Sequence, residues 1–194
     1  AASSNVCQAG TTGTANGEFS KWPIGNVIAA DKPGSGTAIY VGDEKRIQEF
    51  NPDGTFKALF PDPAEKIKNG GQVKSLAIDS SGNAYVSSEG KAGVTKLDSS
   101  GAFECEAAVT KPTAVAVDGV GDLYAVNSAA SPPSILQFLS SSCASTGVSF
   151  GSDELTNSTT FPTTGLATGE GCLTAGANLS VSNFEAGGPD SFIR

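Results

Sequence analysis

Residues 38–56 read AIYVGDEKRIQEFNPDGTF, and this stretch decides the fold because the chain repeats it. It joins a short aromatic and β-branched run to a second run that begins with Arg, and it ends in an NPDG turn followed by Thr-Phe. Related phrases follow downstream: residues 83–103 contain NAYV, VTKL and DSSG, and residues 121–142 contain GDLYAV and ILQF. Recurrence at this scale indicates a repeat architecture.

Each repeat opens with a short run of small and aliphatic residues that ends in an aspartate. The phrases IAAD, LAID and VAVD end at Asp31, Asp79 and Asp118, which are 48 and then 39 residues apart. Repeats of this length fit propeller blades of four antiparallel strands, with the small residues on the innermost strand. We expect each aspartate to accept hydrogen bonds from the amides of the following turn, whose Gly adopts a positive φ.

A tyrosine recurs in the second predicted strand of every repeat, at Tyr40, Tyr85 and Tyr124. This position suits a residue that packs between neighbouring blades while its hydroxyl reaches a polar partner. After the third predicted strand, NPDG at 51–54 or DSSG at 98–101 turns the chain into a fourth, outer strand.

The sequence therefore predicts an all-β protein with a lead-in segment at residues 1–26 and repeats over residues 27–194. In the lead-in segment, Phe19 and Trp22 are expected to pack against the first blade. The four predicted blades span about 27–60, 73–109, 112–150 and 162–194.

The fourth copy is weaker than the others because it lacks both the Asp and the Tyr. Its phrases are TGLAT at 164–168, GCLTA at 171–175 and LSVSNF at 179–184. The polar stretch 151–164 is expected to be an exposed loop, and residues 63–69 are expected to form at most one helical turn.

These phrases resemble the NHL-repeat family of β-propellers, most closely at residues 38–56. In the second and third copies Gly93 and Ser134 replace Arg46. The resemblance implies an NHL-type propeller of about four blades. Such propellers usually close with about six blades, so we expect an incomplete ring or a fragment of a longer chain, with a closed four-bladed ring as the alternative. Exposed sheet edges would favour self-association.

The four cysteines, Cys7, Cys105, Cys143 and Cys172, are far apart and form no CxxC motif, which disfavours a zinc site. Cys105 and Cys143 both follow the third strand of consecutive repeats, so a bridge between them is one expectation, and separate buried thiols are the other. The opening of the chain also resembles NHL regions of large exported actinobacterial proteins. We therefore expect an extracellular or cell-surface setting with disulfides.

Charge narrows the classes of partner. The 194 residues carry 12 basic and 20 acidic side chains, for a net charge of −8, which disfavours nucleic acid or an anionic membrane as the main partner. No apolar run is long enough to cross a bilayer. Histidine is absent, which removes the commonest general base and metal ligand.

Some relatives of such propellers are Ca²⁺-dependent lactonases or hydrolases, so the resemblance offers candidate oxygen ligands. These candidates are Asp31, Asp79, Asp118, Asn83, Asp122 and Asn127. The three leading aspartates share one position in the repeat, which favours turn capping over metal binding. The pairs Asp43-Glu44 and Asp153-Glu154 are interpreted as solvated loop charges, because adjacent strand residues point to opposite faces.

We assign no catalytic, cofactor or metal residues from the sequence. The expected function is a non-enzymatic exported propeller module that binds a protein or a glycan, or a scaffold within a larger surface protein. Loops such as 128–134 would carry the contacts. The alternative is a Ca²⁺-dependent lactonase-like or lyase-like enzyme.

Overall fold

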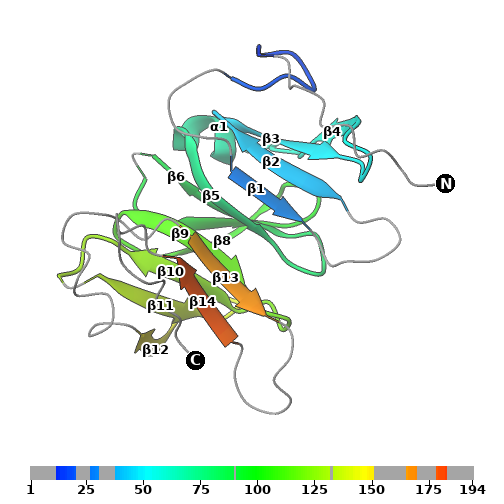
Figure 1. Ribbon diagram of the computed structural model, residues 1–194. Coiled ribbons are helices and arrows are strands. Elements are labelled where there is room, and N and C mark those ends of the chain that lie inside the picture. The colour runs from blue at the N-terminus through cyan, green and yellow to red at the C-terminus, as the bar shows by residue number, and fades with distance from the viewer. Residues whose placement is uncertain are drawn as a thin grey trace, which may run out of the picture.

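The described part of the chain forms three four-stranded antiparallel sheets and a strand pair (Figure 1). The computed structural model describes residues 12–20, 27–30, 38–89, 91–131, 133–150, 165–169 and 178–182. The prediction of an all-β protein is confirmed. The fourth predicted repeat is described only in its two strands, and Trp22, Asp31 and residues 151–164 lie outside the described part.

Strand order follows chain order within each sheet. Sheet 1 contains β1 (Val27–Ala30), β2 (Ile39–Asp43), β3 (Arg46–Phe50) and β4 (Phe56–Leu59). Sheet 2 contains β5 (Val73–Ile78), β6 (Ala84–Ser88), β7 (Val94–Leu97) and β8 (Phe103–Ala107). Sheet 3 contains β9 (Pro112–Val117), β10 (Leu123–Asn127), β11 (Ser134–Phe138) and β12 (Ser145–Phe150).

The remaining elements are short. The helix α1 (Lys66–Gly70) connects sheets 1 and 2, close to the helical turn expected at 63–69. β13 (Gly165–Gly169) pairs directly with β14 (Asn178–Ser182). These two strands overlap the phrases TGLAT and LSVSNF of the weaker fourth copy, and residues 171–175 lie outside the described residues. No helix in the described part of the chain is long and apolar enough to span a membrane.

The sheets follow one another with their first strands side by side. β1 contacts β5, β5 contacts β9, and β9 contacts β13. Within the described residues this succession does not close into a ring. In sheets 1 and 2 the second strand is more buried than the outer, fourth strand: every residue of β6 is buried, whereas most of β8 is exposed. The first strand of sheet 1, β1, is only partly buried.

Two apolar clusters hold the sheets together, one on each side of sheet 2. The first joins sheets 1 and 2 around Tyr40, Ile47 and Leu97. The second joins sheets 2 and 3 around Tyr85 and Phe138. Strand alternation explains this arrangement, because successive residues of a central strand such as β6 reach opposite neighbouring sheets.

A disulfide joins Cys105 in β8 to Cys143 in the β11–β12 turn. The predicted pairing of these two cysteines is thus confirmed, while Cys7 and Cys172 lie outside the described residues. Beside the bridge, the buried Lys96 pairs with Glu104 at 2.6 Å and donates to the carbonyl of Ser140 at 2.8 Å. The outer part of the contact between sheets 2 and 3 is therefore both cross-linked and hydrogen-bonded.

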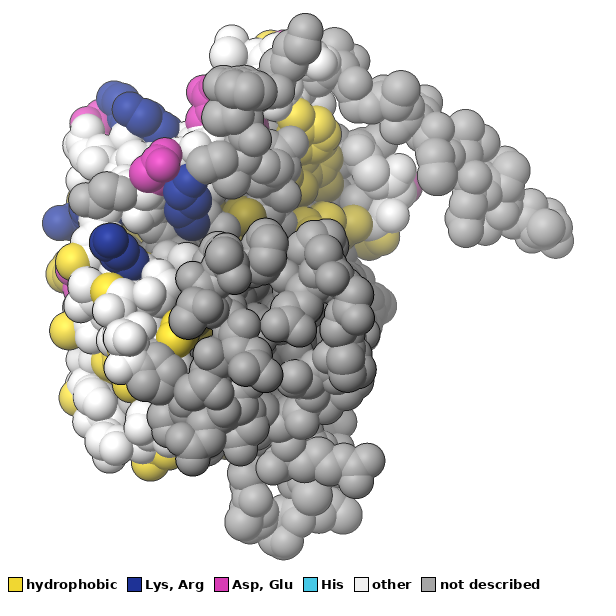
Figure 2. All heavy atoms as spheres, turned by 60° about the vertical axis from the view of Figure 1, so that its left-hand side comes forward, with side chains coloured by type: hydrophobic (Ala, Val, Ile, Leu, Met, Phe, Trp, Pro, Cys, Tyr) yellow, Lys and Arg dark blue, Asp and Glu magenta, His cyan; other side chains and the backbone are white. Residues whose placement is uncertain are grey.

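Charged side chains are unevenly distributed over the surface. On the face seen in Figure 2, Lys and Arg side chains gather at one end with a few acidic groups among them. This concentration of basic groups contrasts with the net charge of −8 of the whole chain.

Candidate functional site

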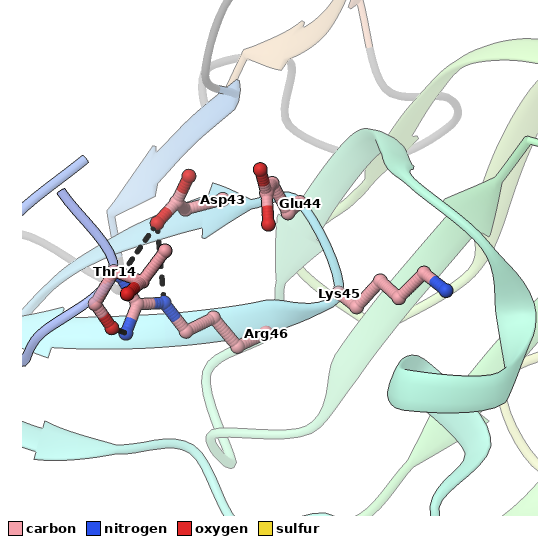
Figure 3. A pocket seen from close by; sticks show the side chains of 5 residues that line it. All are labelled: Thr14, Asp43, Glu44, Lys45 and Arg46. Atoms are coloured by element: carbon pink, nitrogen blue, oxygen red, sulfur yellow. Dashed lines mark hydrogen bonds and ion pairs between the residues drawn. The ribbon is translucent and has the colours of Figure 1, made fainter. Parts of the chain in front are cut away.

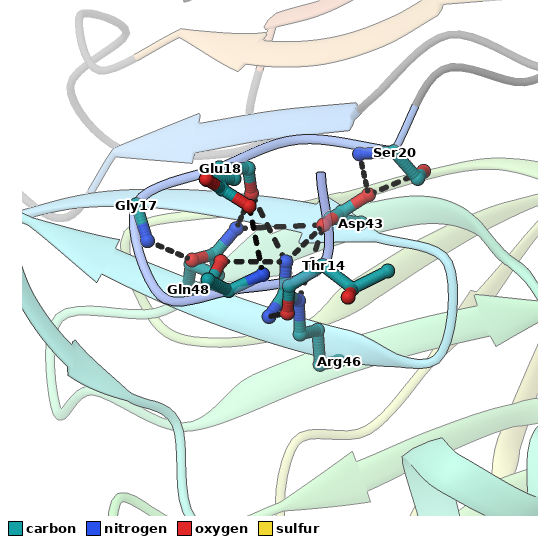
Figure 4. Close-up of polar contacts among 8 residues, drawn as sticks. Thr14, Gly17, Glu18, Ser20, Asp43, Arg46 and Gln48 are labelled. Atoms are coloured by element: carbon teal, nitrogen blue, oxygen red, sulfur yellow. Dashed lines mark hydrogen bonds and ion pairs between the residues drawn. The ribbon is translucent and has the colours of Figure 1, made fainter. Parts of the chain in front are cut away.

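The candidate site lies where residues 12–20 pack against the β2–β3 hairpin of sheet 1 (Figure 4). The side chains of Asp43, Arg46, Gln48 and Phe50 point to the face of sheet 1 turned away from sheet 2, which we call the far face. This follows from alternation, since Tyr40 and Ile47 belong to the cluster shared with sheet 2. Residues 12–20 cover part of this far face.

Asp43 and Arg46 form the centre of the contact. The guanidinium of Arg46 donates to Oδ2 of Asp43 from Nε at 3.1 Å and from Nη2 at 2.8 Å. Ser20 donates to Oδ1 of the same carboxylate from its backbone N at 3.0 Å and from its hydroxyl at 2.6 Å. Both carboxylate oxygens are thus engaged, which allows a charged group with only 1% exposure to remain in the sheet.

The protonation of Asp43 follows from these contacts. Burial acts to raise the pKa of Asp43, but the hydrogen bonds from Ser20 and Arg46 outweigh burial and hold the pKa below its usual value. Asp43 is therefore a carboxylate at neutral pH, paired with a guanidinium that is always charged.

Arg46 also reaches the backbone of the covering segment. It donates to the carbonyl oxygens of Thr14 at 2.6 Å, Ala15 at 3.2 Å and Glu18 at 3.0 Å. The planar guanidinium carries five N–H donors in a fixed fork, so one side chain can satisfy an acid and several carbonyls at once.

Gln48 completes the polar contacts. Its Nε2 donates to the Glu18 carbonyl at 2.8 Å, and its Oε1 accepts from the Gly17 amide at 2.9 Å. Gln48 is completely buried. Next to it the rings of Phe19 and Phe50 stack with centroids 5.5 Å apart, which confirms the expectation that Phe19 packs against the first repeat.

A small pocket opens beside this contact (Figure 3). It has a volume of about 150 Å³ and is lined by Thr14, Asp43, Glu44, Lys45 and Arg46. This is smaller than the roughly 300–1,000 Å³ of typical small-molecule sites. Glu44 in the hairpin turn has φ of 51°, a backbone conformation that is uncommon for a residue other than glycine.

The polar residues of this site depart from the repeat pattern. Strand register aligns Asp43 with Asn127, Arg46 with Ser134, and Gln48 with Leu136. Leu136 packs against the apolar cluster between sheets 2 and 3. At the position of Gln48, sheet 3 therefore carries an apolar residue, whereas sheet 2 carries the polar Thr95. The charged pair of Asp43 and Arg46 has no equivalent in sheets 2 and 3.

The aspartates predicted to cap turns do so where the structure describes them. Oδ1 of Asp79 accepts from the amides of Ser81 at 2.9 Å and Asn83 at 3.0 Å. Oδ1 of Asp118 accepts from the amide of Asp122 at 2.9 Å. Gly82 and Gly121 have the expected positive φ, at 80° and 90°.

The recurring tyrosine bonds these capping aspartates. The Tyr85 hydroxyl lies 3.3 Å from Oδ2 of Asp79 and 3.1 Å from the carbonyl of Gly121 in sheet 3. Tyr124 makes the equivalent contact to Asp118 at 3.3 Å. Burial, followed by the nearby aspartate charge, raises the pKa of both phenols, to about 12 for Tyr124. The prediction of a polar partner for these hydroxyls is confirmed.

The candidate calcium ligands are engaged with other protein groups in the described structure. Asn83 donates to Asp79 at 2.8 Å, whereas Asp122 accepts from the Ser140 amide at 3.0 Å and Asn127 accepts from the Ala129 amide at 3.2 Å. Among the described residues no group of three or more Asp, Glu or Cys side chains is placed to hold a metal ion.

One interpretation from the sequence is wrong for Asp43. It was expected to be a solvated loop charge, and it is buried and paired with Arg46, while only its neighbour Glu44 is exposed. The pair Asp153-Glu154 lies outside the described residues. The signal that could have identified the site is the departure of Asp43, Arg46 and Gln48 from the other repeats.

Comparison with known proteins adds no identification. No protein-family model matches the chain, and no curated protein matches it in sequence.

Proposed function

We propose that this chain is a non-enzymatic module of an exported protein, built as an incomplete β-propeller of the NHL type. In this proposal it serves as a rigid scaffold and contacts a protein or a glycan through one side of its sheets. Side-by-side first strands, buried second strands and exposed outer strands support the propeller assignment. The disulfide supports an oxidising compartment.

The contact surface would be the side that carries the β2–β3, β6–β7 and β10–β11 connections, which we call the connection side. Hydrogen bonds link these connections to the stretches that enter β5 and β9. The pairs are Val73 to Glu44 at 2.7 Å, Glu89 to Gln72 at 2.7 Å, Gly93 to Val109 at 2.7 Å and Ser128 to Lys111 at 2.7 Å. The connection side is therefore one continuous surface on a fixed framework.

The observation that carries this proposal is the difference in charge between the two sides. The connection side presents the exposed lysines Lys45 and Lys111 beside the exposed acids Glu44 and Glu89, so these four charges balance. The turns at the opposite side, at 51–55, 79–83, 98–102 and 118–122, contain five aspartates and no lysine or arginine. In a protein with a net charge of −8, an acidic partner would approach the connection side in preference to the opposite one.

The capping aspartates support a scaffold role for the opposite side. Asp79 and Asp118 already accept hydrogen bonds from turn amides and tyrosine hydroxyls. Their contribution is to fix the turns and, through Tyr85, to tie sheet 2 to sheet 3.

The test is binding of the full chain to an array of acidic and neutral glycans, with acidic proteins as a second panel. We expect binding of an acidic probe that is lost in the variant Lys45→Glu/Lys111→Glu. Lys57→Glu on β4 is the matched control for the single variants Lys45→Glu and Lys111→Glu, because it makes the same charge change away from the connection side and should retain binding.

Two results would overturn the proposal. One is equal binding by the double variant and the control, or no binding to either panel. The other is micromolar Ca²⁺ binding by calorimetry together with hydrolysis of a lactone panel, which would establish the enzyme alternative.

A further inference from the structure

On the far face, sheet 1 contacts mainly the backbone of residues 12–20 and only a few side chains of that segment. Arg46 and Gln48 bind the carbonyl oxygens of Thr14, Ala15 and Glu18 and the amide of Gly17. The side chains that the sheet contacts in the segment are the Ser20 hydroxyl and the Phe19 ring. Contacts of this kind are how proteins recognise a peptide conformation, with a few side-chain pockets for specificity.

The covering segment makes hydrogen bonds within itself as well as to the sheet. The Gly13 amide donates to the Phe19 carbonyl at 2.9 Å, and the Glu18 amide donates to the Ala15 carbonyl at 3.1 Å. Oε2 of Glu18 also accepts from the Ala15 amide at 3.0 Å. A segment with its own internal hydrogen bonds loses less conformational entropy on binding than an extended one.

The receiving side chains form a built site. Gln48 and Asp43 are 0% and 1% exposed, and both direct polar atoms at the segment. The pocket beside Thr14 leaves further room next to the bound segment. Because the equivalent positions in sheet 3 are Asn127, Ser134 and Leu136, the site belongs to the first repeat and is not a property of the repeat itself.

We propose that Asp43, Arg46 and Gln48 form a peptide-recognition site, which residues 12–20 fill within the chain and which the same segment of a second copy fills between chains. Residues 12–20 are the proposed ligand because the structure shows this segment bound to the site. If two copies exchange this segment, each site keeps the same contacts, so the dimer forms at a low cost in free energy. This inference does not depend on the function proposed for the connection side.

The test uses two complementary full-length variants. The acceptor, Phe19→Ala/Ser20→Ala, keeps the receiving residues and weakens its own segment. The donor, Arg46→Ala/Gln48→Ala, keeps the segment and loses the receiving residues. We expect a one-to-one dimer by sedimentation velocity when the two are mixed, and monomers when each is alone. The matched control mixes the donor with a chain that carries all four substitutions, and it should stay monomeric.

A peptide titration keeps the proposal testable if the donor variant does not fold. A fluorescent peptide TGTANGEFS is titrated by anisotropy against the acceptor and against the unaltered chain. Because a tethered segment competes at roughly millimolar effective concentration, the acceptor should bind the peptide about ten-fold or more tightly than the unaltered chain.

A folded acceptor that neither binds the peptide nor pairs with a folded donor would overturn the proposal. In that case the contact would be a permanent part of one chain. Circular dichroism and thermal melts of each variant establish folding before either measurement.

Discussion

Loss of the Cys105–Cys143 bridge should lower the free energy of unfolding by about 4 kcal/mol. The bridge spans 38 residues, and closing a loop of this length in the unfolded chain removes about 13 cal/mol/K of entropy, or about 4 kcal/mol at 25 °C. The variant Cys105→Ala/Cys143→Ala tests this value, and urea unfolding under oxidising conditions measures it.

A matched control comes from the other two cysteines. Cys7→Ala/Cys172→Ala removes the same number of cysteines and leaves the bridge intact. Added reductant should lower the urea midpoint of the unaltered chain and of this control, and should leave the bridge variant unchanged. Hydrogen exchange should increase first near β8 and residues 139–144, where Lys96 otherwise holds the Ser140 carbonyl.

The reasoning would be refuted by either of two results. A loss below about 1 kcal/mol in the bridge variant would mean that the cross-link does not restrict the unfolded chain as its span requires. An equal loss in the control would mean that the cysteines act through packing or through other pairings.

Further predictions concern turns and titrating groups. Ala at Gly101 would place Cβ 2.0 Å from the Pro61 carbonyl oxygen at φ of 78°, whereas Gly54, at φ of 84°, has no atom within 4 Å. Urea unfolding should therefore show a loss above about 2 kcal/mol for Gly101→Ala and about 1 kcal/mol for Gly54→Ala; equal losses would contradict this. The pKa of Tyr85 and Tyr124 is higher in the folded than in the unfolded chain. The stability that the protonated phenols contribute is therefore complete below about pH 10 and is lost as the pH rises from there through their folded pKa. In a Tyr40→Phe background, absorbance at 295 nm should show both ionising only at about pH 12 or above; ionisation near pH 10 in this variant with native circular dichroism would count against it. Asp43→Asn should destabilise at pH 7, and the difference from the unaltered chain should shrink as pH falls below about 4, because the folded pKa of Asp43 is lowered; a pH-independent difference would refute this.

Local signals in the sequence predicted most of the described fold. The turns after Asp79 and Asp118 need an oxygen acceptor at the start and a residue with positive φ near the end, and both requirements are visible in five consecutive residues. The Tyr85 contact could be predicted because it recurs at one position of the repeat. The disulfide could be predicted because Cys105 and Cys143 follow equivalent strands.

The pairing of β13 with β14 could not be predicted, because the fourth copy lacks the Asp and Tyr that mark the register of the others. The far-face site was missed for a different reason. Its partners are backbone groups 28 to 32 residues from Arg46 in the chain, and backbone atoms leave no trace in a sequence. Adjacent acids such as Asp43 and Glu44 are usually exposed to solvent. Asp43 is buried because it forms an ion pair with Arg46.

Arg46 and Gln48 show how the side chains of a sheet face match the groups that cover it. In sheet 3 the position equivalent to Gln48 is Leu136, which packs in the cluster that covers sheet 2. In sheet 1 the same face meets backbone carbonyls and amides, which an aliphatic side chain would leave unsatisfied at a cost of about 1–3 kcal/mol each. The polar side chains of Arg46 and Gln48 therefore match the backbone groups of residues 12–20 that cover them. The same chemistry makes the contact exchangeable, since a hydrogen-bonded segment that leaves returns its donors and acceptors to water, whereas a separated apolar sheet face would lose its burial outright.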